Sequence, residues 1–266
     1  MHARRDRMIS ILGAMALGAL LVMGLGTAQA DTLPDTAERV QQSVVGIATF
    51  KPTRSPRADY MGTGFVVGDG RLVVTNFHVI PESLDTERRE RLVVISGHGR
   101  DTEIHHAEVV AQSVDHDLAL LRISAPSLPA LRLGSSDAVR IGEELAFTGY
   151  PIGMILGLYP ATHRASVAAR TPMVIPARSS SELDERRIRA LRNNPPMVFQ
   201  LDATAYPGNS GSPVYRKDSG AVVGVVNQVF VQGGREAAVS QPSGISYAIP
   251  SDRIRPLLDE YHANGN

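Results

Sequence analysis

Residues 64–75 read GFVVGDGRLVVT, which places two short apolar, β-branched runs on either side of Gly68-Asp69-Gly70. Because glycine adopts positive φ freely, this spacing predicts two strands joined by a tight hairpin. Runs this short, bounded by turn residues, are typical of strands rather than helices. Similar runs recur on both sides of the hairpin. The set before residue 125 comprises residues 44–47, 64–67, 72–75, 92–95, 109–110 and 118–121. Closely spaced strands of this kind predict a small closed barrel.

A second series of such runs follows a proline-containing interruption, SAPSLP at residues 124–129. We place the domain boundary there, so that residues 31–125 and 126–250 form two barrels in tandem. A final segment, residues 251–266, predicts a short C-terminal helix and tail, because Asp252 stands early in it and apolar residues follow. The later strand-like runs are residues 145–147, 165–168, 197–200, 214–215, 221–226 and 245–248.

The first thirty residues predict an export signal. Arginines at residues 4, 5 and 7 precede an apolar run over residues 8–26, and Ala28-Gln29-Ala30 follows. This order predicts a signal peptide, residues 1–30, cleaved after Ala30, and therefore a periplasmic or secreted protein. The alternative is an uncleaved membrane anchor, since the run borders on the length that spans a bilayer. We expect contact with a membrane only in that alternative.

Composition excludes several classes of function. The chain has no cysteine, which excludes thiol catalysis and a disulfide framework. Lys plus Arg and Asp plus Glu number 27 each, so no global field favours nucleic acid, and we expect none as a partner.

One segment differs from its strand-rich surroundings. Residues 181–191, SELDERRIRAL, carry acidic residues early, basic residues late and spaced apolar positions, before NNPP at residues 193–196. This pattern predicts a short helix inserted in a loop. It is either a solvated surface excursion or a segment that gates activity, since loops of this size are often functional.

The strongest local signal for chemistry is PGNSGSP at residues 207–213, directly after a predicted strand. A serine nucleophile needs an exposed hydroxyl and backbone N–H groups aimed at the developing oxyanion. Gly208, Asn209 and Ser210 form a candidate oxyanion hole, with the N–H groups of Gly208 and Ser210 as donors. The alternative is a plain polar turn.

A serine nucleophile also needs a base. His78 ends an apolar strand in VVTNFHVI, residues 73–80, and Asp117 directly precedes the strand LALL, residues 118–121. Taken singly, His78 could be a core or edge histidine and Asp117 a turn residue. Together with Ser210 they stand in the chain order His, Asp, Ser that the chymotrypsin barrels use for their triad.

Five segments make the chain resemble the trypsin-like serine peptidases, and within them the HtrA (Deg) branch. They are GTGF at residues 62–65, TNFHVI at 75–80, DLALL at 117–121, GNSG at 208–211 and YAIPS at 247–251. The resemblance extends from about Val44 to Ile254. It implies two antiparallel six-stranded β-barrels with the active site between them, and a serine endopeptidase that acts on polypeptides. In that role His78 is the general base and Asp117 orients it.

No cofactor or metal is implied by this resemblance. His98, His105 and His106 lack the accompanying carboxylate and spacing of a zinc site, and a polar hairpin is the preferred interpretation. We expect no PDZ domain after the predicted terminal helix, which would be a departure from the HtrA pattern. HtrA proteins usually have glycine at the position of Ser212. A serine at this position resembles the glutamyl endopeptidases instead.

Five residues are predicted to bind substrate. By their distance from Ser210, Thr204 and Ala205 lie at the base of the primary pocket, and neither carries a charge that would select Lys or Arg. Val225, Val226 and Asn227 are expected to form an edge strand that pairs with extended substrate. Val226 stands where glutamyl-specific relatives have a histidine. We therefore expect an uncharged, aliphatic side chain before the cut.

Two alternatives of function stay open at this point. The fold could serve as a latent or non-catalytic module that binds polypeptides, or the hydrolysed bond could be an ester or a cell-wall amide. The sequence indicates no oligomeric state.

Overall fold

The computed structural model describes residues 32–151, 157–173, 195–227 and 244–265. The predicted signal peptide, residues 1–30, and the predicted helix at residues 181–191 lie outside these ranges. No helix within the described part of the chain is long and apolar enough to cross a membrane.

The first barrel is closed and antiparallel, with strand order β1-β2-β3-β6-β5-β4. Its strands are β1 (Val44–Phe50), β2 (Ala58–Val67), β3 (Leu72–Thr75), β4 (Arg91–His98), β5 (Asp101–Ser113) and β6 (Leu118–Ile123). The predicted hairpin joins β2 to β3, and both of its glycines have positive φ, 63° at Gly68 and 85° at Gly70. Between them Asp69 accepts a hydrogen bond from the Arg71 N–H at 3.0 Å, which closes the turn.

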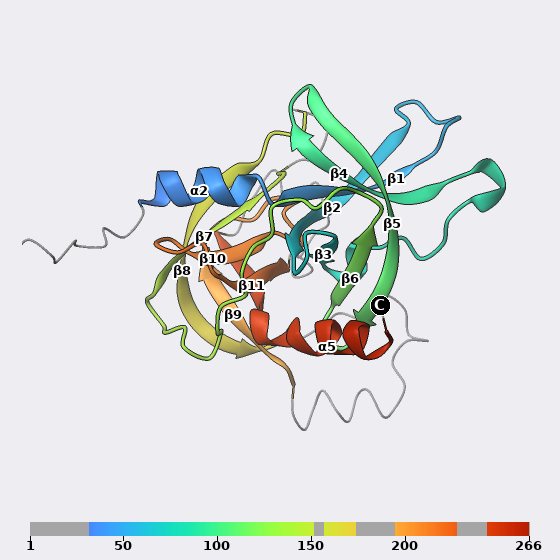
Figure 1. Cartoon of the computed structure of the whole chain (residues 1–266). Helices are drawn as coiled ribbons and strands as arrows, with labels where there is room; N and C mark the ends of the chain where they lie inside the picture. Colours follow the sequence, from blue (N-terminus) through green and yellow to red (C-terminus); the bar gives the residue numbers. More distant parts are fainter. Residues whose placement is uncertain (1–31, 152–156, 174–194, 228–243, 266) are drawn as a thin grey trace, which may run out of the picture. The chain divides into compact units, whose positions relative to one another are not determined.

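The second barrel is likewise closed and antiparallel, with strand order β10-β11-β12-β9-β8-β7 (Figure 1). Its strands are β7 (Glu144–Gly149), β8 (Ala161–Pro172), β9 (Met197–Asp202), β10 (Pro213–Arg216), β11 (Val222–Asn227) and β12 (Ile245–Pro250). The connection between the barrels, residues 124–143, contains the predicted domain boundary. The predicted all-β architecture of two six-stranded barrels is therefore confirmed.

Helices near the two ends of the described chain cross over to the opposite barrel. The C-terminal helix α5 (Arg255–Ala263), which the sequence predicted, packs against β5 and β6 of the first barrel. The N-terminal helix α2 (Leu33–Gln41) was not predicted, and it contacts β7 of the second barrel. Its Val40 joins a buried cluster with residues of both barrels. Figure 1 shows α2 beside β7 and β10 and α5 beside β5 and β6.

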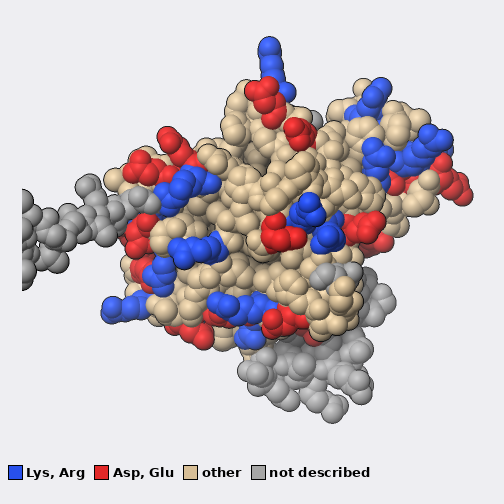
Figure 2. All heavy atoms as spheres, viewed as in Figure 1, with Lys and Arg blue, Asp and Glu red and all other residues tan. Residues whose placement is uncertain are grey.

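Buried side chains of both barrels pack together in shared clusters. Phe65 and Leu72 of the first barrel pack in the same cluster as Val225 and Ile249 of the second. Complete burial of such side chains contributes about 1.5–3 kcal/mol each. The two barrels are thus fixed against each other, which matters because the predicted triad draws residues from both. On the face drawn in Figure 2, acidic and basic side chains are interspersed without a large patch of either sign.

Candidate active site

The predicted acid and base meet where two loops of the first barrel converge. After β3, Asn76 leads into a single 3-10 turn, Phe77–Val79, that carries His78. Asp117 stands directly before β6 with a positive φ of 49°. The Asp117 Oδ2 atom lies 2.6 Å from His78 Nδ1, and Asp117 Oδ1 accepts the His78 backbone N–H at 2.8 Å. One carboxylate therefore holds both the ring and the main chain of the histidine.

The backbone of Asp117 is held as firmly as its side chain. Its carbonyl oxygen accepts the Phe77 N–H at 3.1 Å and the Asn76 side-chain amide at 3.1 Å. Aspartate is one of the few residues that tolerates positive φ. These contacts, together with a residue exposure of 4%, leave the carboxylate a single orientation.

A third side chain reaches Asp117 from the second barrel. Asn227, at the end of β11, donates its Nδ2 to Asp117 Oδ2 at 2.9 Å and is itself 1% exposed. With the two His78 groups, this gives the buried carboxylate three N–H donors, as a desolvated charge requires. The contact also ties the predicted acid to the barrel that carries Ser210.

The predicted nucleophile lies on the loop between β9 and β10. Gly208 and Gly211 have φ values of 99° and 88°, which favour glycine. Asn209 N–H donates to the Tyr206 carbonyl at 2.9 Å, and Ser212 N–H donates to the Asn209 carbonyl at 3.0 Å. In the described part of the chain, the N–H groups of Gly208 and Ser210 have no acceptor. These are the two donors that the sequence assigned to an oxyanion hole.

The nucleophile loop and the histidine turn meet on strand β2. A Cβ added to Gly62 would lie 2.8 Å from the Val79 side chain and 3.1 Å from the Ser210 carbonyl oxygen. The residue after His78 and the backbone of Ser210 therefore flank the same glycine. Within the described residues, however, no hydrogen bond joins the Ser210 hydroxyl to His78. Such contacts are often long in a protein without substrate and tighten when substrate binds.

The expectation that Val225 and Val226 belong to an edge strand is wrong. In the closed barrel β11 lies between β10 and β12, and Val225 pairs with Pro213 on one side and Ile249 on the other. The Val226 N–H donates to the Ser212 carbonyl, and its own carbonyl accepts the Gly211 N–H, both at 2.9 Å. Closure of the barrel uses the backbone groups that an edge strand would leave for substrate.

The other predicted substrate residues have different surroundings. Ala205 is 9% exposed and packs in the core of the second barrel, whereas Thr204 beside it is partly exposed. The backbone of Asn227 pairs with Tyr247 on one side, and the residues that follow it lie outside the described ranges. Its side chain, which the sequence did not connect with the triad, is committed to Asp117.

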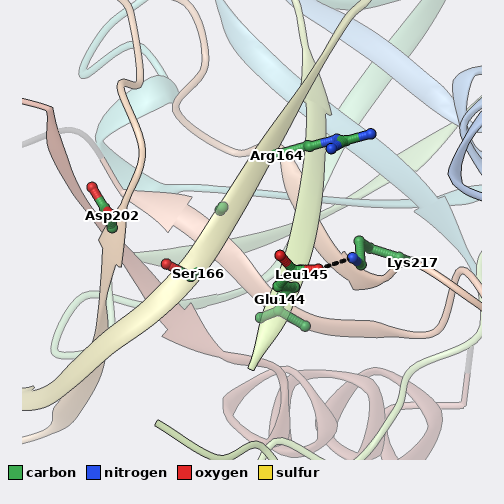
Figure 3. A pocket seen from close by; sticks show the side chains of 7 residues that line it. Glu144, Leu145, Arg164, Ser166, Asp202 and Lys217 are labelled. Carbon is green, nitrogen blue, oxygen red and sulfur yellow. Dashed lines mark hydrogen bonds and ion pairs between the residues drawn. The ribbon is translucent and has the colours of Figure 1, made fainter. Parts of the chain in front are cut away.

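Two further features lie away from this site. Among the described residues, His105 is hydrogen-bonded through Nε2 to the Ser96 hydroxyl at 2.7 Å, and no group of three or more potential ligands has the arrangement of a metal site. A small hollow of about 170 Å³ on the second barrel contains none of the predicted site residues. Figure 3 shows its lining, including the ion pair between Lys217, which follows β10, and Glu144 at the start of β7.

Comparison with known proteins identifies the family of this chain. The family model for the trypsin-like peptidase domain matches residues 62–225. The chain belongs to the trypsin-like peptidase family. The matched range contains His78, Asp117 and Ser210 and ends within β11, two residues before Asn227.

Curated relatives of this trypsin-like peptidase are HtrA-type proteins. The mouse protein "Serine protease HTRA4" is 33% identical over 233 residues, which cover 85% of this chain and 40% of the relative. A "Probable periplasmic serine endoprotease DegP-like" of Halomonas elongata is 28% identical over 210 residues, with 77% and 36% covered. The chain spans about two fifths of the length of these relatives.

Solved structures show the same fold. "HtrA-type protease AlgW with decapeptide" superposes with a TM-score of 0.63 at 21% identity, over 88% of this chain and 69% of that one. A second structure, "HtrA-type protease AlgW with tripeptide", gives a TM-score of 0.61 at 22% identity. The sequence-based recognition of an HtrA-like trypsin fold is confirmed.

Proposed function

We propose that this trypsin-like peptidase is an exported serine endopeptidase that hydrolyses peptide bonds of polypeptides through an acyl-enzyme on Ser210. The observation that carries the proposal is the combination of a histidine held by a buried carboxylate with a serine loop that has two unpaired N–H groups. A polar turn without a catalytic role would require neither the histidine–carboxylate pair nor the two N–H groups. The names of the HtrA and DegP relatives support the same activity.

The mechanism follows from the contacts of these groups. Ser210 Oγ attacks the substrate carbonyl while His78 Nε2 takes the hydroxyl proton, and Asp117 keeps the other ring proton on Nδ1. The carbonyl oxygen becomes negative and accepts the N–H groups of Gly208 and Ser210. His78 then gives this proton to the leaving amine. In the second step water attacks the acyl group while His78 takes a proton from it, and His78 returns that proton to Ser210 Oγ as the acid is released.

The substrate and the compartment are part of the proposal. An uncharged side chain before the cut suits Thr204 and Ala205, neither of which offers a countercharge. Export suits the predicted signal peptide and the names of the relatives, several of which are called periplasmic. The AlgW structures contain a decapeptide and a tripeptide, which supports polypeptides as the substrate class.

A latent resting state is the second candidate, and one observation favours it. The Ser210 hydroxyl and His78 are not hydrogen-bonded to each other in the described residues. In a latent protein, binding of a polypeptide would bring the Ser210 and His78 side chains together. A protein in which these side chains always stayed apart would only bind polypeptides.

The test is covalent labelling by a phosphonylating probe, read by intact mass on protein that begins at Asp31. An assembled site takes up one probe molecule on the wild-type protein, and the Ser210→Ala variant takes up none. Labelling that begins only when a peptide is added would identify the latent state. A folded wild-type protein that stays unlabelled with and without peptide would overturn the endopeptidase proposal.

Loss of the Asn227 side chain tests whether the second barrel supports the triad. We expect Asn227→Ala to lower kcat by about 10- to 100-fold, because Asp117 loses one of three donors and can turn away from His78. KM for a peptide substrate should change little. Steady-state kinetics check this, with circular dichroism as the folding control. A variant with unchanged kcat and a raised KM would instead place the Asn227 side chain in substrate binding.

A further inference from the structure

Strand β2 of the first barrel holds the nucleophile loop at two points through one residue. The Thr63 N–H donates to the Ser210 carbonyl at 2.8 Å, and the Thr63 hydroxyl donates to the Gly208 carbonyl at 2.7 Å. Thr63 is fully buried. The loop belongs to the second barrel, so these contacts cross from one barrel to the other.

A second hydroxyl from the same strand reaches the same carbonyl. Tyr60 lies 3.0 Å through its hydroxyl from the Gly208 carbonyl oxygen and 3.0 Å from Thr63 Oγ1. Its ring stands edge-on to Tyr150, with ring centres 6.3 Å apart. Burial raises the pKa of Tyr60 far above its usual range, so the phenol keeps the proton that it donates.

Each of these two hydroxyls has a single proton to donate. Thr63 Oγ1 accepts the Tyr150 N–H at 3.1 Å, which leaves its single proton for the Gly208 carbonyl. The single Tyr60 proton lies within reach of the Gly208 carbonyl and Thr63 Oγ1, both at 3.0 Å, and of the Tyr150 carbonyl at 3.4 Å. When Tyr60 donates to the Gly208 carbonyl, that oxygen has two hydroxyl donors for its two lone pairs. We call this arrangement of Tyr60, Thr63 and the Gly208 carbonyl the hydroxyl clasp.

The hydroxyl clasp fixes the orientation of peptide planes in the nucleophile loop. The peptide unit between Gly208 and Asn209 is held by the clasp at its carbonyl and by the Tyr206 carbonyl at its N–H, 2.9 Å away. The unit between Ser210 and Gly211 is held by Thr63 at its carbonyl and by Val226 at its N–H. Peptide units are rigid planes. Fixing these two units therefore limits the rotation of the unit between residues 207 and 208 and of the unit between residues 209 and 210. Those are the units that carry the two unpaired N–H groups.

We propose that the hydroxyls of Tyr60 and Thr63 are positioning groups that assemble the oxyanion hole from the opposite barrel. This inference rests on the proposed function, since it concerns the same loop. Thr63 also connects to the histidine side of the site: its carbonyl accepts the hydroxyl of Thr75 at 2.7 Å, and Thr75 ends the strand that leads to His78. The loop comes so close here that a Cβ on Gly211 would lie 1.9 Å from the Thr63 carbonyl oxygen.

Kinetics of hydroxyl-deleted variants test the clasp. Thr63→Val keeps the shape and the backbone N–H but removes the hydroxyl, and we expect kcat to fall about 10- to 100-fold with KM nearly unchanged. Thr63→Ser should restore most of the activity because it restores the hydroxyl. Tyr60→Phe should lower kcat by about three- to tenfold, since one of two donors remains. Tyr159→Phe removes a hydroxyl from an exposed ring outside the clasp and should leave kcat unchanged.

Amide hydrogen exchange provides a readout that a loss of general stability would not reproduce. In Thr63→Val, the hydrogen-bonded amides of Asn209 and Gly211 should exchange faster than in the wild type, while those of β4 and β5 keep their rates. If the wild type hydrolyses peptide and both Thr63→Val and Tyr60→Phe match it in kcat and exchange, the clasp proposal is overturned and the endopeptidase stands. A wild type that neither hydrolyses peptide nor takes up the phosphonylating probe would overturn the proposed function, and the positioning role with it.

Discussion

Replacing Ser210 by alanine will lower kcat for peptide hydrolysis by about a millionfold, the loss seen when the nucleophile of a serine peptidase is removed. No acyl-enzyme can form, because the methyl group has no oxygen to attack the substrate. The Gly208 and Ser210 N–H groups remain, so a residual rate above that of water is expected. Fluorogenic peptide hydrolysis at high protein concentration measures the loss.

The fold of the Ser210→Ala variant should be unaffected. The Ser210 hydroxyl makes no hydrogen bond among the described residues, and the backbone contacts of the loop do not depend on it. We expect a change in the free energy of unfolding within about 0.5 kcal/mol. A variant that unfolds like the wild type and still hydrolyses peptide at more than a hundredth of its rate would show that another residue is the nucleophile.

Replacing Asp117 by asparagine will lower kcat by about 10⁴-fold, because the amide inverts the hydrogen bonding of the imidazole. Where Asp117 Oδ2 now accepts from His78 Nδ1, an amide nitrogen would donate to it. The ring proton would then sit on Nε2, which could no longer take the proton of Ser210. Steady-state kinetics on the purified variant measure this loss.

Asparagine is the right substitution at this position for a structural reason. Asp117 has a φ of 49°, and asparagine tolerates that conformation whereas alanine would strain it. The carbonyl of Asp117 keeps its contacts with Phe77 and Asn76 in the variant. Thermal unfolding is the control. If the folded variant keeps kcat within tenfold of the wild type, Asp117 does not orient the base.

The proposed site is built by contacts that cross from one barrel to the other. Asn227 of the second barrel reaches Asp117 of the first, while Thr63 of the first reaches Gly208 and Ser210 of the second. Both sets of contacts are needed to hold the acid, the base and the serine loop close to one another. The core that the two barrels share therefore matters to chemistry as well as to stability.

Local patterns in the sequence were enough to predict the strands, whereas the candidate triad was predicted from the chain order of His78, Asp117 and Ser210 and from the resemblance to a family. The alternation of short β-branched runs with turn residues depends only on neighbouring residues, and all twelve predicted runs coincide with strands of the two barrels. The hairpin at residues 68–71 was predictable for the same reason, since glycine at positive φ is a local property. The helix α2 was missed although its start carries local signals, a capping box between Thr32 and Asp35 and a proline in the first turn.

Tertiary structure alone decided how the backbone of β11 is used and what holds the loop. Whether Val225 lies at an edge depends on which strands become its neighbours, and closure of the barrel gave it two. The sequence predicted Asn227 to be a substrate-binding residue. Its side chain instead donates a hydrogen bond to Asp117, which is 110 residues away in the chain. The roles of Tyr60 and Thr63 were invisible for the same reason. The sequence names the residue types that can do the chemistry, but a hydrogen bond over such a separation exists only once the packing of both barrels brings its two ends together.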